Sequence, residues 1–138
     1  MLMLSCESST LRVLVVDDHE LTRLTLQLIL SAQEKIQVVG LASNGQEAIE
    51  MVQRYQPDVI VLDLQMPVMD GWSASNHIKS IAPHTQIIAY SSVEDSKLLE
   101  AKATGNLDAF CKKDVPTGEL VTLVRQLGQR ATDDSVTG

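Results

Sequence analysis

Three acidic side chains stand directly after short apolar stretches of this sequence: Asp17 and Asp18 after one stretch, and Asp63 after another. If folding gathers them, their like charges repel, and holding them together is costly without a counter-cation. Oxygen ligands with little Cys or His nearby suit a hard ion, and Mg²⁺ typically takes one or two carboxylates and keeps several waters. The three carboxylates therefore indicate a magnesium site.

The same acids are candidates for covalent chemistry, because a carboxylate can attack phosphorus and form an aspartyl phosphate. The transferring group spreads negative charge over its oxygens, so its site needs fixed cationic and hydroxyl donors as well as a metal. Ser91 and Lys113 also follow apolar stretches, and they offer a hydroxyl and an ammonium group. Together with Asp18 and Asp63, they would supply the set that phosphoryl transfer requires.

The apolar stretches that precede these side chains predict the strands of a sheet. Each is short and rich in β-branched residues or leucine, as expected of strands buried on both faces. The five predicted strands are Leu11–Val16, Ile36–Leu41, Val59–Leu62, Gln86–Tyr90 and Ala109–Cys111.

Segments with helical periodicity lie between and after the predicted strands. Leu21, Leu24 and Leu28 recur at i, i+3 and i+7 and indicate the first helix. Asn44 and Glu47 stand in capping-box positions at the start of the second. The second helix carries Ala48, Val52 and Tyr55 on one face, and a third helix after Gly71 carries Ala74, Ile78 and Ile81. A fourth helix is predicted from about Glu94 to Thr104, with Gly105 as its C-terminal cap. A fifth helix begins at Pro116 and carries Leu120, Leu123, Val124 and Leu127. The small polar tail after Arg130 is expected to be frayed.

Five strands alternating with five helices imply a parallel sheet with right-handed crossovers and helices on both faces. In such sheets, ligands bind beyond the carboxyl ends of the strands, near the point where the strand order reverses. The three acids, Ser91 and Lys113 are all expected at that rim.

Length and composition limit the class of protein. A chain of 138 residues suits one domain that can bury a core without disulfides. Because 44% of the residues are apolar and only 3% are aromatic, the core is predicted to be aliphatic. The net charge of −7 offers no electrostatic footprint for nucleic acid or an anionic membrane, so direct nucleic-acid binding by this chain is not expected.

The chain shows no sign of secretion or membrane insertion. Met1–Leu4 is apolar, but it lacks a basic flank and is too short for a signal peptide, and no later stretch is long enough to span a bilayer. Cys6 and Cys111 form no spaced framework, which fits a reducing compartment. A cytoplasmic protein is therefore expected.

Four motifs carry a resemblance to a known family: Val15-Val16-Asp17-Asp18, Asp63-Leu64-Gln65-Met66-Pro67-Val68-Met69-Asp70-Gly71, Ser91-Ser92 and Lys113-Asp114-Val115-Pro116. From Leu11 to Gln129 the sequence resembles the CheY-like receiver domain of two-component response regulators. The resemblance implies a doubly wound α/β fold of the flavodoxin-like type, with a five-stranded parallel sheet in the order 2-1-3-4-5, five helices and three α/β/α layers. It also implies an N-terminal extension over 1–10, a receiver domain over 11–130 and a C-terminal tail over 131–138.

The resemblance assigns a role to each acid. Asp63 would be the phosphoacceptor and a ligand of Mg²⁺. Asp18 would be the main side-chain ligand of the metal. Asp17 would not coordinate the metal directly but would hold the metal or one of its water ligands in place. The backbone carbonyl of Gln65 would complete the protein ligands.

The resemblance also assigns the donors and the switch. Lys113 would pair with the phosphoryl oxygens, and Ser91 would swing in to hydrogen-bond them. Phe110 occupies the aromatic switch position that couples to Ser91. Pro67 and Gly71 would shape the loop behind the phosphoacceptor.

The function that the resemblance implies is signalling, with no enzyme activity beyond self-phosphorylation and self-dephosphorylation. A histidine kinase or phosphotransfer protein would donate the phosphoryl group, which slow self-catalysed hydrolysis would then remove. The output would be a changed surface on the predicted fourth helix, fifth strand and fifth helix, which a downstream protein or effector domain reads. Formation of a homodimer, through the fourth and fifth or the first and fifth helices, stays open.

Asp17-Asp18-His19 and the Lys-Asp-x-Pro run at Lys113 resemble the receivers usually fused to a LuxR-type helix-turn-helix domain. No such domain follows Gly138, which leaves a stand-alone regulator and a truncated receiver as the two interpretations. Ser91 stands where Thr is commoner, and Phe110 stands where Tyr is commoner, so the switch residue has no hydroxyl.

Other functions on the same fold class fit these residues less well than a receiver does. A module that binds partners without phosphate would be expected to lose one of the acids, the hydroxyl or the lysine, and this sequence retains them all. A phosphatase of the dehalogenase type needs a second acid two residues after the nucleophile, where Gln65 stands. A flavin carrier needs a phosphate-cradling loop after the first strand, where Asp17 and Asp18 stand. His19, beside them, could tune the metal site, but it is expected to face solvent.

Overall fold

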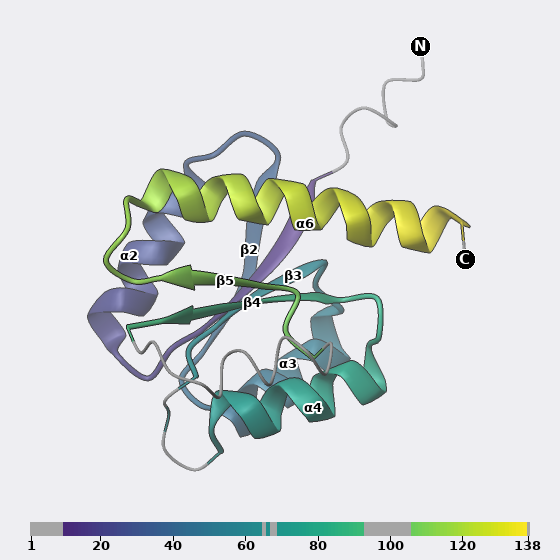
Figure 1. The fold of residues 1–138 in the computed structure, drawn as a ribbon, viewed down its shortest axis with the longest axis horizontal. Helices are drawn as coiled ribbons and strands as arrows, with labels where there is room; N and C mark the ends of the chain where they lie inside the picture. The colour runs from purple at the N-terminus through teal and green to yellow at the C-terminus, as the bar shows by residue number, and fades with distance from the viewer. Residues whose placement is uncertain (1–9, 65, 67–68, 93–105, 138) are drawn as a thin grey trace.

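Five parallel strands form one sheet in the computed structural model, in the order β2-β1-β3-β4-β5 (Figure 1). The structure describes residues 10–64, 66, 69–92 and 106–137, with side chains as far as residue 131. The parallel pairing and the strand order that the resemblance implied are confirmed. The strands are β1 (Leu11–Val16), β2 (Ile36–Ala42), β3 (Val59–Leu62), β4 (Gln86–Ser91) and β5 (Ala109–Lys112).

The carboxyl ends of the strands meet at one edge of the sheet. Val16 of β1 is level with Ala42 of β2 and with Leu62 of β3, and Ser91 of β4 is level with Lys112 of β5. Because all five strands run in one direction, the residues that follow them emerge at this edge. The strand β4 includes Ser91, one residue more than the sequence suggested.

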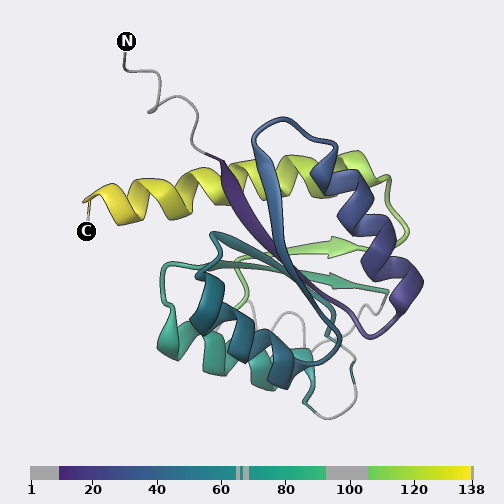
Figure 2. The same cartoon turned by 180° about the vertical axis from the view of Figure 1, so that it is seen from behind.

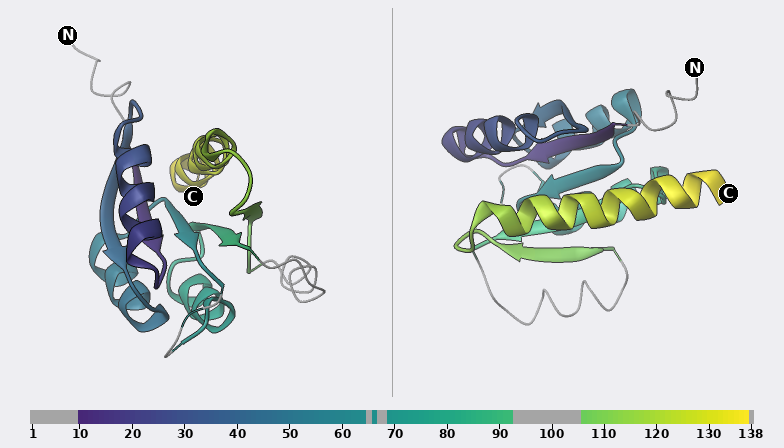
Figure 3. Two further views of the ribbon diagram at one scale, coloured as in Figure 1. Left: turned by 90° about the vertical axis from the view of Figure 1, so that its left-hand side faces the viewer. Right: turned by 90° about the horizontal axis from the view of Figure 1, so that it is seen from above.

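Helices cover both faces of the sheet and complete three layers (Figures 2 and 3). The two pairs are α2 (Glu20–Ser31) with α6 (Thr117–Thr137) on one face, and α3 (Gly45–Tyr55) with α4 (Gly71–Ile81) on the other. Side chains of a strand alternate between the layers, so Val13 and Val15 pack with α2 and α6, whereas Leu14 and Val16 pack with α3 and α4. The expected helix from about 94 to 104 and its cap at 105 lie outside the described residues.

The helix α2 buries a side other than the one marked by its leucine spacing. Leu26 and Leu30 are buried against the sheet, at 2% and 0% exposure. The stripe of Leu21, Leu24 and Leu28 that indicated the helix faces solvent, with exposures of 79%, 44% and 73%. The helix carries leucine on two sides, so the period identified the helix without selecting its buried face.

The last helix is longer than the sequence suggested. It continues through Thr137, whereas the sequence predicted an end near Arg130 and a frayed tail. Ala131 lies inside the helix and is buried at 4% exposure. Within the described ranges, none of the helices combines the length and the hydropathy that crossing a bilayer requires.

Side-chain caps fix the starts of α3 and α4. Asn44 Oδ1 accepts a hydrogen bond from Glu47 N at 2.9 Å, which confirms the predicted cap. Glu47 reaches back to the N–H of Ser43 at 2.8 Å, one residue before the cap, and this hydrogen bond lowers the pKa of Glu47. Asp70 caps α4 by accepting from Ser73 N at 2.8 Å. The two caps define the conformation of the loops that lead into these helices.

Candidate functional site

Backbone hydrogen bonds hold two acids and the lysine at the carboxyl-end edge of the sheet. Asp17 N donates to Ala42 O at 3.0 Å, and Asp63 N donates to Val16 O at 2.9 Å. Lys113 N donates to Ser91 O at 3.1 Å. Each bond extends the hydrogen bonding of neighbouring strands by one residue, so the strand order determines which side chains meet.

The acids gather as the strand order predicted. Asp17 and Asp63 are buried, at 1% and 3% exposure, and the Asp18 side chain is 28% exposed. One potential ligand atom from each of Asp17, Asp18, His19 and Asp63 lies within 4.8 Å of the others. Carboxylates this close raise the free energy of the site unless cations lie among them.

Lys113 supplies one such cation. Its Nζ lies 2.9 Å from Asp17 Oδ2 and 3.6 Å from Asp63 Oδ2. Burial by itself would lower the pKa of Lys113, but the hydrogen bond to Asp17 and the charges of both acids outweigh burial, so the pKa is raised. The ammonium group therefore stays protonated at neutral pH, between the two buried carboxylates.

His19 contacts the acids instead of only facing solvent. Its ring is 68% exposed, yet Nδ1 lies 3.2 Å from Asp17 Oδ1 and 3.1 Å from Asp18 Oδ1. The backbone N–H of His19 also donates to Asp17 Oδ1 at 2.9 Å. His19 is therefore exposed as expected, and as the N-cap residue of α2 it also lies against the acids.

Two residues near the site escaped the sequence reasoning. Arg23 donates from its guanidinium to Asp17 O at 2.8 Å, and the ring centroid of Tyr90 lies 5.7 Å from Lys113 Nζ. The position of Tyr90, directly before Ser91 in a chain with two tyrosines, was the available signal. The Arg23 contact depends on how α2 packs, and no local pattern marks it.

The donor set fits a hard divalent cation. Among the described residues, Asp18 Oδ1 is a buried atom with no hydrogen-bond partner, its nearest charged neighbour being His19 Nδ1 at 3.1 Å, and a metal ion would satisfy it. The neighbouring ligand atoms are mainly carboxylate oxygens, as Mg²⁺ prefers. The expected carbonyl ligand at Gln65 lies outside the described residues.

Ser91 and Phe110 share one face of the sheet. Ser91 is buried at 1% exposure, and alternation along β4 puts it on the same face as Ala89. Ala89 is level with Phe110 of β5, and Phe110 packs partly buried against the core on the side of α3 and α4. The peptide bond from Lys113 to Asp114, like all the described peptide bonds, is trans.

Gly71 lets the helix α4 approach the backbone of Asp63. The N–H of Gly71 donates to Leu64 O at 3.2 Å. A Cβ atom at position 71 would collide with the carbonyl oxygen of Asp63 and lie 2.7 Å from the Cα of Leu64. The predicted loop-shaping role of Gly71 thus has a steric basis. Pro67, which was given the same role, lies outside the described residues.

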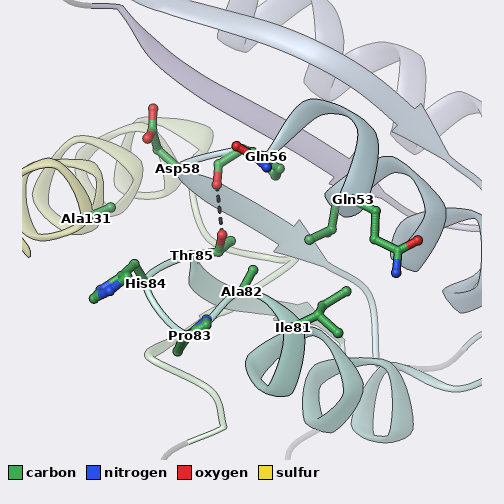
Figure 4. Close-up of a pocket in the computed structure, with 11 residues that line it drawn as sticks. Gln53, Gln56, Asp58, Ile81, Ala82, Pro83, His84, Thr85 and Ala131 are labelled. Carbon is green, nitrogen blue, oxygen red and sulfur yellow. Dashed lines mark hydrogen bonds between the residues drawn. The ribbon is translucent and has the colours of Figure 1, made fainter. Parts of the chain in front are cut away.

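A depression of about 560 Å³ lies at the other end of the sheet, where the residues that precede β3 and β4 meet the ends of α3 and α4 (Figure 4). Two of its polar side chains bond to the protein itself. Thr85 Oγ1 donates to Pro57 O at 2.9 Å, and Asp58 Oδ2 accepts from Arg12 N at 2.9 Å. Among the described residues that line this depression, Asp58 is the single acid, in contrast to the cluster at the carboxyl-end edge.

Comparison with known proteins agrees with this geometry. A family model described as the response regulator receiver domain matches residues 13–125. The receiver domain of CheB from Thermotoga maritima has a TM-score of 0.79 and 32% identity, with 87% of this chain and 97% of that chain covered. The receiver domain of the putative response regulator NarL from Mycobacterium tuberculosis has a TM-score of 0.81 and 30% identity, covering 88% and 98%.

This chain spans only part of the length of two curated relatives. A protein-glutamate methylesterase/protein-glutamine glutaminase 2 from Photobacterium profundum is 44% identical over 107 residues, which are 75% of this chain and 27% of the relative. The response regulator protein VraR from Staphylococcus epidermidis is 35% identical over 117 residues, 84% of this chain and 56% of VraR. The family model and the two solved receivers cover nearly all of the sheet and its helices, and on these grounds the chain belongs to the response regulator receiver domain family of two-component systems.

Proposed function

We propose that this chain accepts a phosphoryl group on Asp63, in a Mg²⁺-dependent reaction, from a histidine kinase or phosphotransfer protein. The observation that carries the proposal is the buried Asp63 carboxylate, which lies 3.6 Å from the Lys113 ammonium and beside Asp17 and Asp18. A buried acid among other acids and one fixed cation suits a site that gains and loses an anionic group.

In the proposed reaction, an oxygen of Asp63 attacks phosphorus and forms an O–P bond. The bond from phosphorus to the donor breaks, and its electron pair leaves with the donor: the imidazole nitrogen of a phosphohistidine, or the carboxylate oxygen of acetyl phosphate. Mg²⁺, held by Asp18, Asp63 and the Gln65 carbonyl with support from Asp17, would neutralise charge on the phosphoryl oxygens. Acetate leaves as a stable anion, and the imidazole leaves as a neutral ring because its other ring nitrogen carries a proton taken up from water, so neither donor needs a proton from the acids of the site.

Lys113 and Ser91 would receive the new charge. The Lys113 ammonium needs only a small shift from Asp17, at 2.9 Å, to pair with a phosphoryl oxygen on Asp63. Ser91 would turn its hydroxyl toward the same group, and Phe110 on the same sheet face would then repack. This couples a local charge change to β5 and its surroundings.

The proposed output surface comprises β5, α6 and the segment 94–104. A depression between β5 and α6, lined among others by Phe110, Val115 and Leu123, offers a place where a partner or effector domain can contact the switch residue. Relatives such as VraR extend well beyond the matched region, so an effector in the same polypeptide and a separate partner protein both fit this proposal.

The test is incubation of the chain with acetyl phosphate, with and without Mg²⁺. Intact-mass spectrometry should show the gain of one phosphoryl group with Mg²⁺ and almost none with excess EDTA. Hydroxylamine should remove the added group, because an acyl phosphate is labile to it. No mass gain with acetyl phosphate, carbamoyl phosphate and phosphoramidate would reject phosphoacceptance and favour a module that binds partners without phosphate.

The exposed stripe of Leu21, Leu24 and Leu28 is proposed as the contact for the protein donor. The helix α2 starts directly after the acids, so its exposed leucines border the edge where a phosphohistidine must enter. Three exposed leucines on one side of a helix form an apolar patch, and patches of this kind are typical of protein–protein contacts.

The double substitution Leu21→Lys with Leu28→Lys should slow transfer from a phosphorylated histidine kinase about tenfold, as loss of a central apolar contact does. The rate with acetyl phosphate should stay unchanged, because the small donor needs no docking surface. Ile81→Lys, at a partly exposed apolar position on α4, is the matched control for added charge. Equal slowing with both donors would instead indicate damage to the site.

A further inference from the structure

Tyr90 is the aromatic residue that lies against the cation of the site. Its ring centroid is 5.7 Å from Lys113 Nζ, which is within the range of a cation–π contact. The residue is 6% exposed and belongs to the strand β4, one residue before Ser91. Burial raises the pKa of its hydroxyl, so the ring stays neutral and its face remains attractive to a cation.

The sheet fixes the ring, whereas the lysine lies in a turn. Tyr90 is level with Cys111 of β5 and packs in the core beneath α2 and α6 with neighbours such as Ile88 and Val124. Lys113 follows the end of β5, and its side chain reaches back to the acids while it is 21% exposed. A rigid aromatic face therefore borders a long, flexible side chain.

The contacts of the ammonium group are divided between two kinds of neighbour. Asp17 and Asp63 lie 2.9 and 3.6 Å from Nζ, and the ring of Tyr90 also lies close to it. An ammonium group bordered only by solvent would be more strongly hydrated and would sample more rotamers. The ring of Tyr90 limits both the hydration and the rotamer sampling of Lys113, because the ring occupies the place of water and does not accept a proton from the ammonium group.

We propose that Tyr90 is a positioning residue that holds the Lys113 ammonium group beside Asp63, ready to receive the phosphoryl oxygens. The inference rests on the proposed phosphoacceptor function and names a residue that acts through Lys113. The aromatic ring carries the effect, and the hydroxyl group does not. The competing interpretation is that Tyr90 only fills core volume, in which case its loss would change stability alone.

The test compares Tyr90→Leu, Tyr90→Phe and the control Tyr55→Leu, all at a temperature where thermal unfolding shows each variant to be folded. Tyr55 is a suitable control because its ring also lies beside a cation, 5.8 Å from Arg54, but far along the chain from Lys113. The initial rate of phosphorylation by acetyl phosphate with saturating Mg²⁺ should fall about fivefold in Tyr90→Leu. The rate should return to the wild-type value in Tyr90→Phe and stay there in Tyr55→Leu.

A second readout follows the contact itself. In lysine-labelled protein, the proton resonances at the end of the Lys113 side chain should be shifted by the aromatic ring current, lose that shift in Tyr90→Leu and regain it in Tyr90→Phe. Wild-type rates in Tyr90→Leu, or Tyr90→Phe as slow as Tyr90→Leu, would overturn the inference. A wild-type chain that accepts no phosphoryl group would reject the proposed function instead, and the resonances would still decide whether Tyr90 holds Lys113.

Discussion

An Asp63→Asn substitution is expected to leave the intact mass of the chain unchanged after incubation with acetyl phosphate and Mg²⁺, whereas the wild type gains one phosphoryl group. The amide of asparagine has nearly the shape of the carboxylate, but it lacks the anionic oxygen that attacks phosphorus. Asp63 is 3% exposed and lies directly after β3. Because asparagine has nearly the size of aspartate, the substitution should preserve the hydrogen bond from the backbone N–H of residue 63 to Val16 O. Complete loss of acceptance is therefore expected without unfolding.

A matched control lies in the same loop. Asp70→Asn also replaces an acid with its amide, and asparagine caps a helix about as well as aspartate. This variant should retain the cap to Ser73 and accept a phosphoryl group at close to the wild-type rate. A phosphoryl group on Asp63→Asn, mapped to another acid such as Asp17 or Asp18, would show that Asp63 is not the sole acceptor.

A Gly71→Ala substitution is expected to impair both stability and phosphorylation. The added Cβ atom would collide with the carbonyl oxygen of Asp63 and come within 2.7 Å of the Cα of Leu64. Backbone atoms cannot rotate away as a flexible side chain can, so α4 or the Asp63 backbone must move. Overpacking of this kind costs about 1–3 kcal/mol in the free energy of unfolding.

Urea denaturation and the acetyl phosphate rate would measure the two effects together. The urea concentration at the unfolding midpoint should be lower for Gly71→Ala than for the wild type. The phosphorylation rate of Gly71→Ala should also fall under conditions where this variant is fully folded, because the strain acts on the peptide unit of Asp63 itself. Gly118→Ala is the matched control, since a Cβ there meets no atom within 4 Å, and it should be neutral or more stable by about 0.5–1 kcal/mol. A Gly71→Ala variant as stable as Gly118→Ala would contradict the close approach of α4.

The positions of the acids could be predicted because strand ends are encoded locally. The run Val59–Leu62 is buried throughout, and an apolar run that stops at an acid marks both the strand and its exit. With parallel strands, Asp17 and Asp63 must leave at the same edge, so their proximity follows from the fold class. The caps at Asn44 and Asp70 are equally local, although only Asn44 was predicted.

Other features depended on which surfaces meet across the fold. Leucine lies on two sides of α2, and only the packing of that helix on the sheet shows that Leu26 is buried and Leu21 exposed. The length of α6 likewise depends on the fold. Ala131 is buried within this helix, although the small and polar residues that follow it in the sequence suggest no helix by themselves. Hydrophobic spacing is ambiguous where more than one face is apolar, since burial is decided by the partner surface.

Three acids, a hydroxyl and a lysine stand at the ends of predicted strands, so the amino-acid sequence already indicates the chemistry that these groups could perform. How closely they meet depends on the fold: Lys113 bonds to Asp17 and lies 3.6 Å from Asp63, with the ring of Tyr90 beside it. The physical reason is that strand ends follow from local pattern, whereas a long side chain such as lysine takes its position from neighbours on other strands. Those neighbours are distant in the sequence, and folding alone brings them together.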